Sequence, residues 1–268
     1  MFTRILLSFF GFLAIGVLYA SWTIDEKYAP ILIPIGIIIA AIIVFTPQID
    51  WWWSNRYPPK TDKRVIQFLE TFYPYYNSLA EPLQKTFLIR AELIIKSMDW
   101  TPMGFEDIPA DVQYVISTYA VRLSLNRQKF IFKYWEKVIL YKHPFPSPQH
   151  PKQLHHSEIF YEDNVVLFDF PHLIKGFINP DNVFPIGLYE MARIYLHDFK
   201  VELGFNPHSF NEAVFSAISG KDFDWIRSSI GLDVLDGEAI AVVCYFLYLD
   251  KTMELMPDWF INCKKEFG

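Results

Sequence analysis

The sequence predicts an α+β fold preceded by two transmembrane helices. Two apolar runs without a charge open the chain, one from Ile5 to Trp22 and one from Ile31 to Phe45. Beyond them, helical spacing of apolar residues comes first, short strand-like runs follow, and helical spacing then returns. Helices and strands that are grouped along the chain, rather than alternating, are typical of the α+β class.

The two apolar runs predict a transmembrane helical hairpin over residues 1–53. The first run, 18 residues long, would extend about 27 Å as a helix, close to the hydrocarbon thickness of a bilayer. The second run needs its flanks to reach that length, and Trp51–Trp53 then fall where an interfacial aromatic belt lies. A cleaved signal peptide and a buried core helix are the alternatives. No convincing small-x-small cleavage site precedes Asp25, and only a short polar segment separates the runs, so we favour the hairpin.

Basic residues predict the orientation of this hairpin. Arg4 precedes the first run and a cluster from Arg56 to Arg64 follows the second, whereas the connecting loop holds only Lys27 beside Asp25 and Glu26. Loops rich in Lys and Arg stay on the cytoplasmic side of a membrane. We therefore expect an integral protein of the inner or plasma membrane with both termini in the cytoplasm.

The charge of the remaining chain argues against nucleic acid as a partner. Residues 54–268 contain 22 basic and 27 acidic side chains, a net charge of −5, whereas nucleic-acid binding needs clustered Lys and Arg. Cys244 and Cys263 form no C-x-x-C motif. In a reducing cytoplasm they indicate neither a disulfide nor a cysteine-based zinc site.

Helices are predicted at the start of the domain that follows the membrane segment. Residues 54–69 are expected to form a linker, polar and proline-containing at its start, before a domain of residues 70–268. The spacing of "SLAE", Ser78–Glu81, predicts a capping box that opens a helix through about Met98. Apolar residues at helical spacing predict a second helix from Ala110 to Leu125.

Strands are predicted in the middle of this domain and helices at its end. "KYWEKVILYKHPFPSP" predicts a strand from Tyr134 to Tyr141 that ends at a proline loop, and "EIFYEDNVVLFDF" predicts one or two more strands. From Phe184 the pattern is helical again, with a second capping box at Ser209–Glu212 and an apolar helix from about Asp236 to Leu249.

Five phrases of the sequence, in this order, resemble the MtfA-like zinc peptidases, also called glucose-regulated metallopeptidases, of the gluzincin type. The phrases are "FEDIPADVQYVISTYAVRLSL", "YWEKVILYKHPFPSP", "DNVVLFDFPHLIKGFINPDN", "FPIGLYEMAR" and "LDGEAIAVVCYF". The resemblance spans most of residues 70–262. It implies a zincin-like domain with a small sheet and an active-site helix.

The resemblance assigns candidate site residues position by position. The family's H-E-x-x-H helix falls on "GLYEMARIYLHDF", so that its two zinc-binding histidines fall on Tyr189 and Arg193. Its general base falls on Glu190, and its third zinc ligand, a glutamate, falls on Glu238; both are retained. A further glutamate of the family falls on Tyr245.

The residues at the two histidine positions are poor zinc ligands. A catalytic zinc needs three protein ligands with available lone pairs. A tyrosine is protonated at neutral pH, and an arginine has no acceptor atom. Glu238 alone will not hold zinc, so we expect no metal and no cofactor at this site. The sequence therefore predicts a catalytically inactive peptidase-fold protein, in which Glu190 keeps the position of the general base.

The function expected of such a chain is binding of a peptide or a protein. A zincin cleft holds a peptide against an edge strand by backbone hydrogen bonds, and this capacity survives loss of the metal. The strand expected in this role, open on one side next to the helix of residues 183–200, contains Val165, Val166, Leu167 and Phe168. The resemblance implies a cytoplasmic protein partner, because the family's founding member is associated with a transcriptional repressor.

An active zinc peptidase with other zinc ligands is the alternative function. The tract "HPFPSPQHPKQLHH" brings His143, His150, His155 and His156, and histidine-rich tracts bind metals. A polar proline loop between strands is the plainer interpretation, and we favour it. His197 lies about 10 Å along the helix from the general-base position, too far to join the same site.

Arg193 suggests a replacement for the metal. Two carboxylates in a cleft repel each other and are costly to desolvate, whereas a guanidinium between them supplies charge and forked donors. We predict a direct salt bridge from Arg193 to Glu238, with Glu190 as the second acceptor and Tyr189 hydrogen-bonded nearby. The alternative is an ordinary solvated or salt-bridged helix face.

Overall fold

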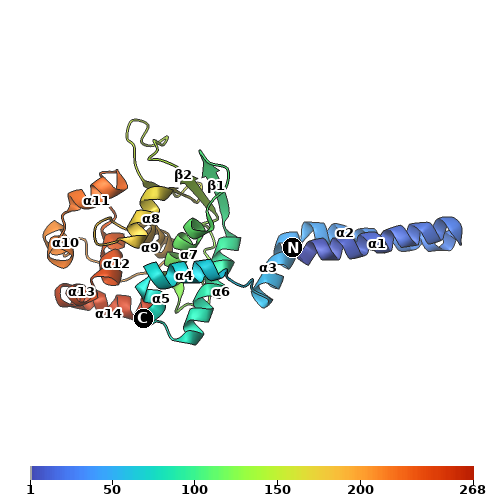
Figure 1. Ribbon diagram of the computed structural model, residues 1–268, viewed down its shortest axis with the longest axis horizontal. Coiled ribbons are helices and arrows are strands. Elements are labelled where there is room, and N and C mark those ends of the chain that lie inside the picture. The colour runs from blue at the N-terminus through green and yellow to red at the C-terminus, as the bar shows by residue number, and fades with distance from the viewer. Residues whose placement is uncertain (1) are drawn as a thin grey trace. The chain divides into compact units, whose positions relative to one another are not determined.

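The computed structural model describes residues 2–268, and the chain divides into two compact units, one that runs to Lys60 and one of Thr61–Gly268 (Figure 1). The first unit consists of α1 (Phe2–Thr23), the 3-10 helix η1 (Glu26–Ile31), α2 (Leu32–Val44) and α3 (Thr46–Arg56). The helical stretches Phe2–Thr23 and Glu26–Val44 are long and apolar enough to cross a membrane. They fit the expected hairpin, and the Thr3 hydroxyl donates to Asp50 at 2.9 Å between α1 and α3.

The segment expected to be a linker, residues 54–69, is largely helical. α3 reaches into its start, and α4 (Lys63–Phe72) occupies its second half. Asp62 caps α4 with a side-chain hydrogen bond of 2.9 Å, and Val65 and Leu69 are buried on one face. Polar side chains on the other face gave this amphipathic helix the appearance of a linker.

Two helices do not use their predicted capping boxes. α6 (Glu81–Ser97), which follows the short α5 (Pro74–Ser78), has Ala80 at its N-cap position without a side-chain hydrogen bond. A proline in the first turn of α6 removes one N–H that would otherwise need a partner. α10 (Glu212–Ser219) is capped by Asn211, whose side chain accepts a hydrogen bond of 3.1 Å. Asparagine caps helices as well as serine does.

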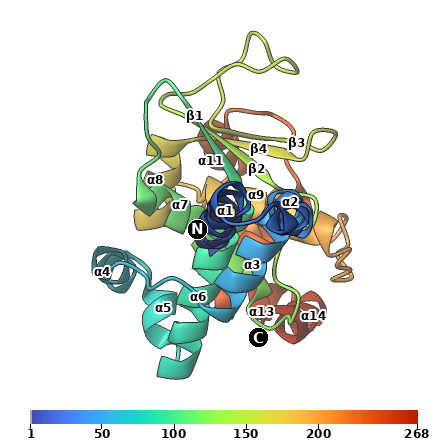
Figure 2. The same cartoon turned by 90° about the vertical axis from the view of Figure 1, so that its right-hand side faces the viewer.

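A four-stranded sheet lies along one side of the second unit, next to its helices (Figure 2). The strands are β1 (Asp99–Met103), β2 (Lys137–Tyr141), β3 (Ser157–Phe160) and β4 (Val165–Asp169), in the order β1-β2-β4-β3. β1, β2 and β4 are parallel, and β3 pairs antiparallel with β4. The sequence predicted β2 and the β3–β4 region. It did not predict β1, which pairs on one side only and contains a proline.

The prediction that β4 lies at the edge of the sheet is wrong, because β4 is an interior strand. It pairs with β2 on one side and with β3 on the other. All five residues of β4 are buried, among them Val165, Val166, Leu167 and Phe168. A continuous apolar run is typical of a strand covered on both faces, and this pattern pointed to an interior position. The predicted peptide groove along this strand is therefore excluded.

Most of the remaining helices of this unit share one hydrophobic core with the inner face of the sheet. They are α7 (Ala110–Ser124), α8 (Phe170–Ile178), α9 (Ile186–Asp198), α11 (Phe223–Ile230), α12 (Gly237–Leu247) and α14 (Pro257–Phe267), whereas α13 (Leu249–Leu255) connects α12 to α14. α9 packs against both α7 and α12. Gly187 permits this close approach, because a Cβ there would lie 2.5 Å from Leu173 Cδ1 and 2.9 Å from Tyr119 Cε2. The predicted α+β class is confirmed.

Candidate functional site

Helix α9 places Tyr189, Glu190 and Arg193 in the centre of the domain. Tyr189 and Arg193 are one turn apart and share a helix face, and Glu190 precedes Arg193 by three residues, which brings their side chains together. Two other elements complete the site. Ser157, at the start of β3, contacts it from the sheet, and Asp236, at the start of α12, contacts it from the neighbouring helix.

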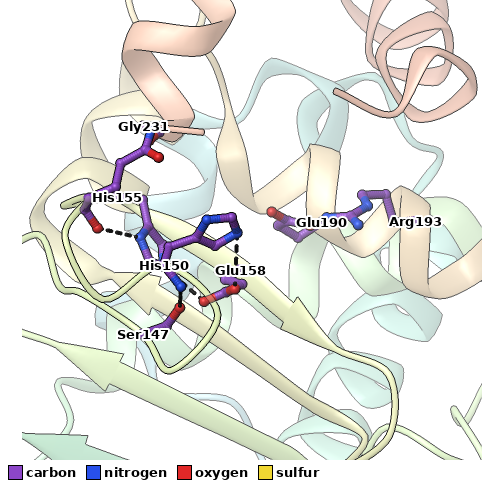
Figure 3. Close-up of polar contacts among 8 residues, drawn as sticks. Ser147, His150, His155, Glu158, Glu190, Arg193 and Gly231 are labelled. Carbon is purple, nitrogen blue, oxygen red and sulfur yellow. Dashed lines mark hydrogen bonds and ion pairs between the residues drawn. The ribbon is translucent and has the colours of Figure 1, made fainter. Parts of the chain in front are cut away.

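Glu190 is fully buried, at 0 % exposure, and both of its carboxylate oxygens are engaged. The Ser157 hydroxyl donates to Oε1 at 2.8 Å, and Arg193 Nη1 donates to Oε2 at 2.7 Å. Glu190 and Arg193 lie side by side in Figure 3. Burial raises the pKa of Glu190, although Arg193 and the Ser157 hydroxyl act to lower it. Both oxygens of this carboxylate already accept hydrogen bonds from the protein, whereas a general base has to face the proton that it abstracts.

Arg193, at a position where the resemblance implies a zinc ligand, carries a fixed positive charge. Its side chain is 22 % exposed, and its guanidinium lies 5.5 Å from the ring centroid of Tyr189 and 5.7 Å from that of Tyr161, within cation–π range. Nε lies 3.8 Å from Asp236 Oδ2. Burial disfavours the charged form, but Glu190, Tyr189 and Tyr161 together outweigh it, and the pKa of Arg193 is raised.

Tyr189 is hydrogen-bonded through its phenol oxygen to the start of α12. The Asp236 N–H donates to Tyr189 Oη at 2.9 Å, and the Asp236 side chain in turn caps α12 by accepting from Ala239 N–H at 3.0 Å. Burial raises the pKa of Tyr189 above its ordinary value. The phenol therefore keeps its proton at neutral pH.

The predicted salt bridge from Arg193 to Glu238 is wrong. Within residues 2–268, Arg193 forms ion pairs with Glu190 and Asp236, while Glu238 has no ion pair. Glu238 is in the first turn of α12, and consecutive residues of a helix point in directions about 100° apart, so it does not share the direction of the capping residue Asp236. Burial, followed by the charge of Asp236, raises the pKa of Glu238. The other parts of that prediction, a pair with Glu190 and a hydrogen bond to Tyr189 nearby, are confirmed.

The donor set of this site does not fit zinc. Of the four site positions that the resemblance implies, Arg193 offers no lone pair and Tyr189 offers a protonated phenol. Glu190 is hydrogen-bonded to Arg193, which leaves Glu238 as the only available carboxylate of the four. A zinc ion there would need displacement of a guanidinium that already neutralises the buried carboxylate.

Three residues of the site were not found from the sequence. Ser157 and Tyr161 lie in or directly after β3, remote in sequence from α9, and a single hydroxyl or ring carries no spacing signal. Asp236 could have been found from the sequence, because an Asp before an apolar helix is a strong N-cap signal. An N-cap side chain keeps one carboxylate oxygen free for another partner, and here that partner is Arg193.

The histidines of the proline-containing tract do not bind to the residues of this site. His150 and His155 face Glu158, and His156 Nδ1 lies 2.7 Å from Asp169 Oδ2, whereas His143 is exposed. The tract therefore does not bring imidazoles to Glu190. His197 packs its ring against Tyr161 at 5.0 Å between centroids.

Comparison with known families supports a zincin-like domain: residues 49–174 match the family described as glucose-regulated metallo-peptidase M90, which is zincin-like. The match covers slightly less than half of the chain and bears out the resemblance seen in the sequence. It ends before α9, so Tyr189, Glu190, Arg193 and Glu238 lie beyond it. No curated protein and no solved structure matches the chain.

Proposed function

We propose that the protein is a membrane-anchored zincin-fold protein without peptidase activity, which acts by binding a protein partner. The observation that carries the loss of activity is the Arg193–Glu190 ion pair, at 2.7 Å and buried. Peptide hydrolysis by a zincin needs a metal that polarises the carbonyl and activates water, together with a free carboxylate base. In this chain an arginine takes the place of the metal, and the carboxylate of Glu190 is neutralised rather than free.

Purified full-length protein is expected to cleave neither an unfolded protein substrate nor a peptide mixture, with or without added zinc. A zinc peptidase assayed in parallel shows that the conditions support cleavage. Glu190→Gln serves as the matched variant, because it removes the base while keeping the side-chain volume. Zinc-dependent cleavage by the wild type that Glu190→Gln abolishes would contradict the proposal.

A groove between α13 and α14 supports the binding function. Its volume is about 440 Å³, and Met253, Pro257, Phe260 and Ile261 line it together with Lys264 and Lys265. Met253 and Ile261 are half exposed, and exposed apolar surface of this kind marks protein-binding sites. Two lysines at the rim favour a partner segment that combines apolar and acidic side chains.

A photo-crosslinking residue placed at Ile261 is expected to give a discrete protein adduct in cells. Lys264→Glu combined with Lys265→Glu should remove the adduct, because the rim then repels acidic side chains. The same crosslinking residue at Val234, which is 85 % exposed, serves as the control. Equal adducts at both positions, or an adduct that the charge reversal leaves unchanged, would show that the groove is not the binding surface.

The anchor of the proposed function is the N-terminal hairpin. By length and composition, two of its helical stretches can cross a membrane, and the basic residues around Arg4 and Arg56–Arg64 support a topology with both termini in the cytoplasm. A reporter fused after Gly268 should therefore be active only as a cytoplasmic probe. Activity of a periplasmic or extracellular reporter at this position would overturn the topology.

A further inference from the structure

Glu158 lies on the face of the sheet that is turned away from α9. Successive side chains of a strand point to opposite faces, and the side chain of its neighbour Ser157 contacts Glu190 on the inner face. The segment of residues 142–156 covers the outer face, where Phe145 packs against the sheet. A buried carboxylate is thus placed under a loop that carries histidines.

The end of this covering segment is firmly held. Phe145 and His155 exchange backbone hydrogen bonds of 3.1 Å, and Gln153 Nε2 donates to the Gly231 carbonyl at 2.7 Å. Gly231 has a φ of +85°, and a Cβ there would lie 2.6 Å from His155 Cα, so only glycine permits this approach. His155 is consequently fixed in position and 0 % exposed.

The polar atoms around Glu158 lack a positive group. His155 Nδ1 lies 3.1 Å from the Gln153 carbonyl oxygen, which only accepts, so Nδ1 carries a hydrogen. The other nitrogen, Nε2, faces Glu158 Oε2 at 2.9 Å. Glu158 Oε1 is buried without a hydrogen-bond partner, and His150 Nε2 lies 3.7 Å from it. Either a proton, carried by the imidazole or by the carboxyl, or a cation has to stand between Nε2 and the carboxyl group.

We infer that His150, His155 and Glu158 bind a zinc ion (Figure 3). Two atoms bound tetrahedrally at about 2.0–2.1 Å from zinc lie roughly 3.3 Å apart, and the spacings of 2.9 Å and 3.7 Å to the carboxylate lie on either side of that value. Within residues 2–268, no three such side chains are placed so that they could hold a metal ion as they stand, so the site forms only if a side chain moves. His150, whose side chain is 34 % exposed, is the ligand that moves.

The surroundings of His155 match those of a metal ligand. A ligating histidine donates its other ring N–H to a carbonyl or carboxylate, which fixes the ring and the tautomer, and the Gln153 carbonyl does so here. Two imidazoles and a carboxylate are a donor set that suits zinc. The ion would join the covering segment to the edge strand β3, on the other side of the sheet from the Arg193–Glu190 pair.

Calorimetric titration of the full-length, detergent-solubilised protein with Zn²⁺ alone tests this inference. One ion per chain is expected to bind. His155→Ala and Glu158→Gln should each weaken binding by at least about 100-fold, since even a change next to a ligand costs 10–100-fold. His143→Ala is the matched control, because His143 belongs to the same segment but is exposed. His150→Ala removes a ligand from a partly exposed position and tests the site without removing a buried group.

Two outcomes would overturn the inference. One is a wild type that binds no zinc, in which case His155 and Glu158 form a proton-held ion pair. The other is zinc binding that His150→Ala and Glu158→Gln leave unchanged, with circular dichroism showing that both variants fold. Neither outcome bears on the absence of peptidase activity, which a separate assay measures.

Discussion

Replacement of Arg193 is expected to lower the free energy of unfolding of the Thr61–Gly268 unit by about 3–5 kcal/mol, because it leaves a buried carboxylate without a counter-charge. Arg193→Met is the sharper variant, since it keeps the aliphatic stem and removes only the guanidinium. Urea denaturation followed by tryptophan fluorescence measures the change. Glu190→Gln added to Arg193→Met should restore part of the loss, because the amide is neutral and Ser157 can still bond to it.

The same variant has a defined dependence on pH. The pKa of Glu190 is raised by burial above the ordinary value of 4.5, so its stabilising contribution is present below that value and is lost as pH rises through the folded-state pKa. Arg193 acts to lower this pKa, and without it the folded-state pKa rises further. The destabilisation of Arg193→Met relative to the wild type should therefore be small near pH 4 and grow toward pH 7. A constant difference across this range would show that the ion pair does not stabilise the fold.

Zinc binding is expected to return when Tyr189→His and Arg193→His are combined. The two imidazoles would stand one helical turn apart, the spacing of the family's ligand pair, and would no longer hold a permanent charge against the carboxylates. Glu158→Gln should be present as background, so that zinc bound by His150 and His155 does not obscure the result. At a zinc concentration of 100 times Kd, the ion stabilises the folded state by about 2.7 kcal/mol.

Two further variants identify the third ligand of the restored site. Glu238→Gln should abolish binding if the family's arrangement is recovered, and Asp236→Asn should abolish it if the present partner of Arg193 serves instead. Arg193→Met with Tyr189→Phe is the control that removes the same groups without adding ligands. A double-histidine variant that gains neither zinc nor thermal stability would show that the loss of the metal site involves more than these two positions.

The elements with a strong local signal were predictable from the sequence, and the pairing between elements was not. The long apolar runs, the helix of α7 and the strand β2 follow from composition and periodicity within one segment. The interior position of β4 depends on β2 and β3, which no local pattern specifies. Its apolar run is typical of an interior strand, whereas the family resemblance implied a position at the edge of the sheet.

The candidate site shows the same division. Glu190 and Arg193 lie three residues apart on one helix, so their contact follows from helical geometry and was predicted. The partner from α12 depends on how that helix is turned, and a difference of two residues along the chain exchanges Glu238 for Asp236. Ser157 comes from a strand more than 30 positions away, and nothing in its own surroundings indicates a buried carboxylate.

The arginine at the centre of the domain changes what the fold depends on. A metal that joins two helices has to be acquired from the cell, and a chain that relies on it is exposed to chelators and to zinc scarcity. Arg193 is synthesised with the chain, and it connects α9 to the cap of α12 as soon as the two helices meet. The junction of these helices is therefore complete at translation, and its stability follows pH rather than zinc supply.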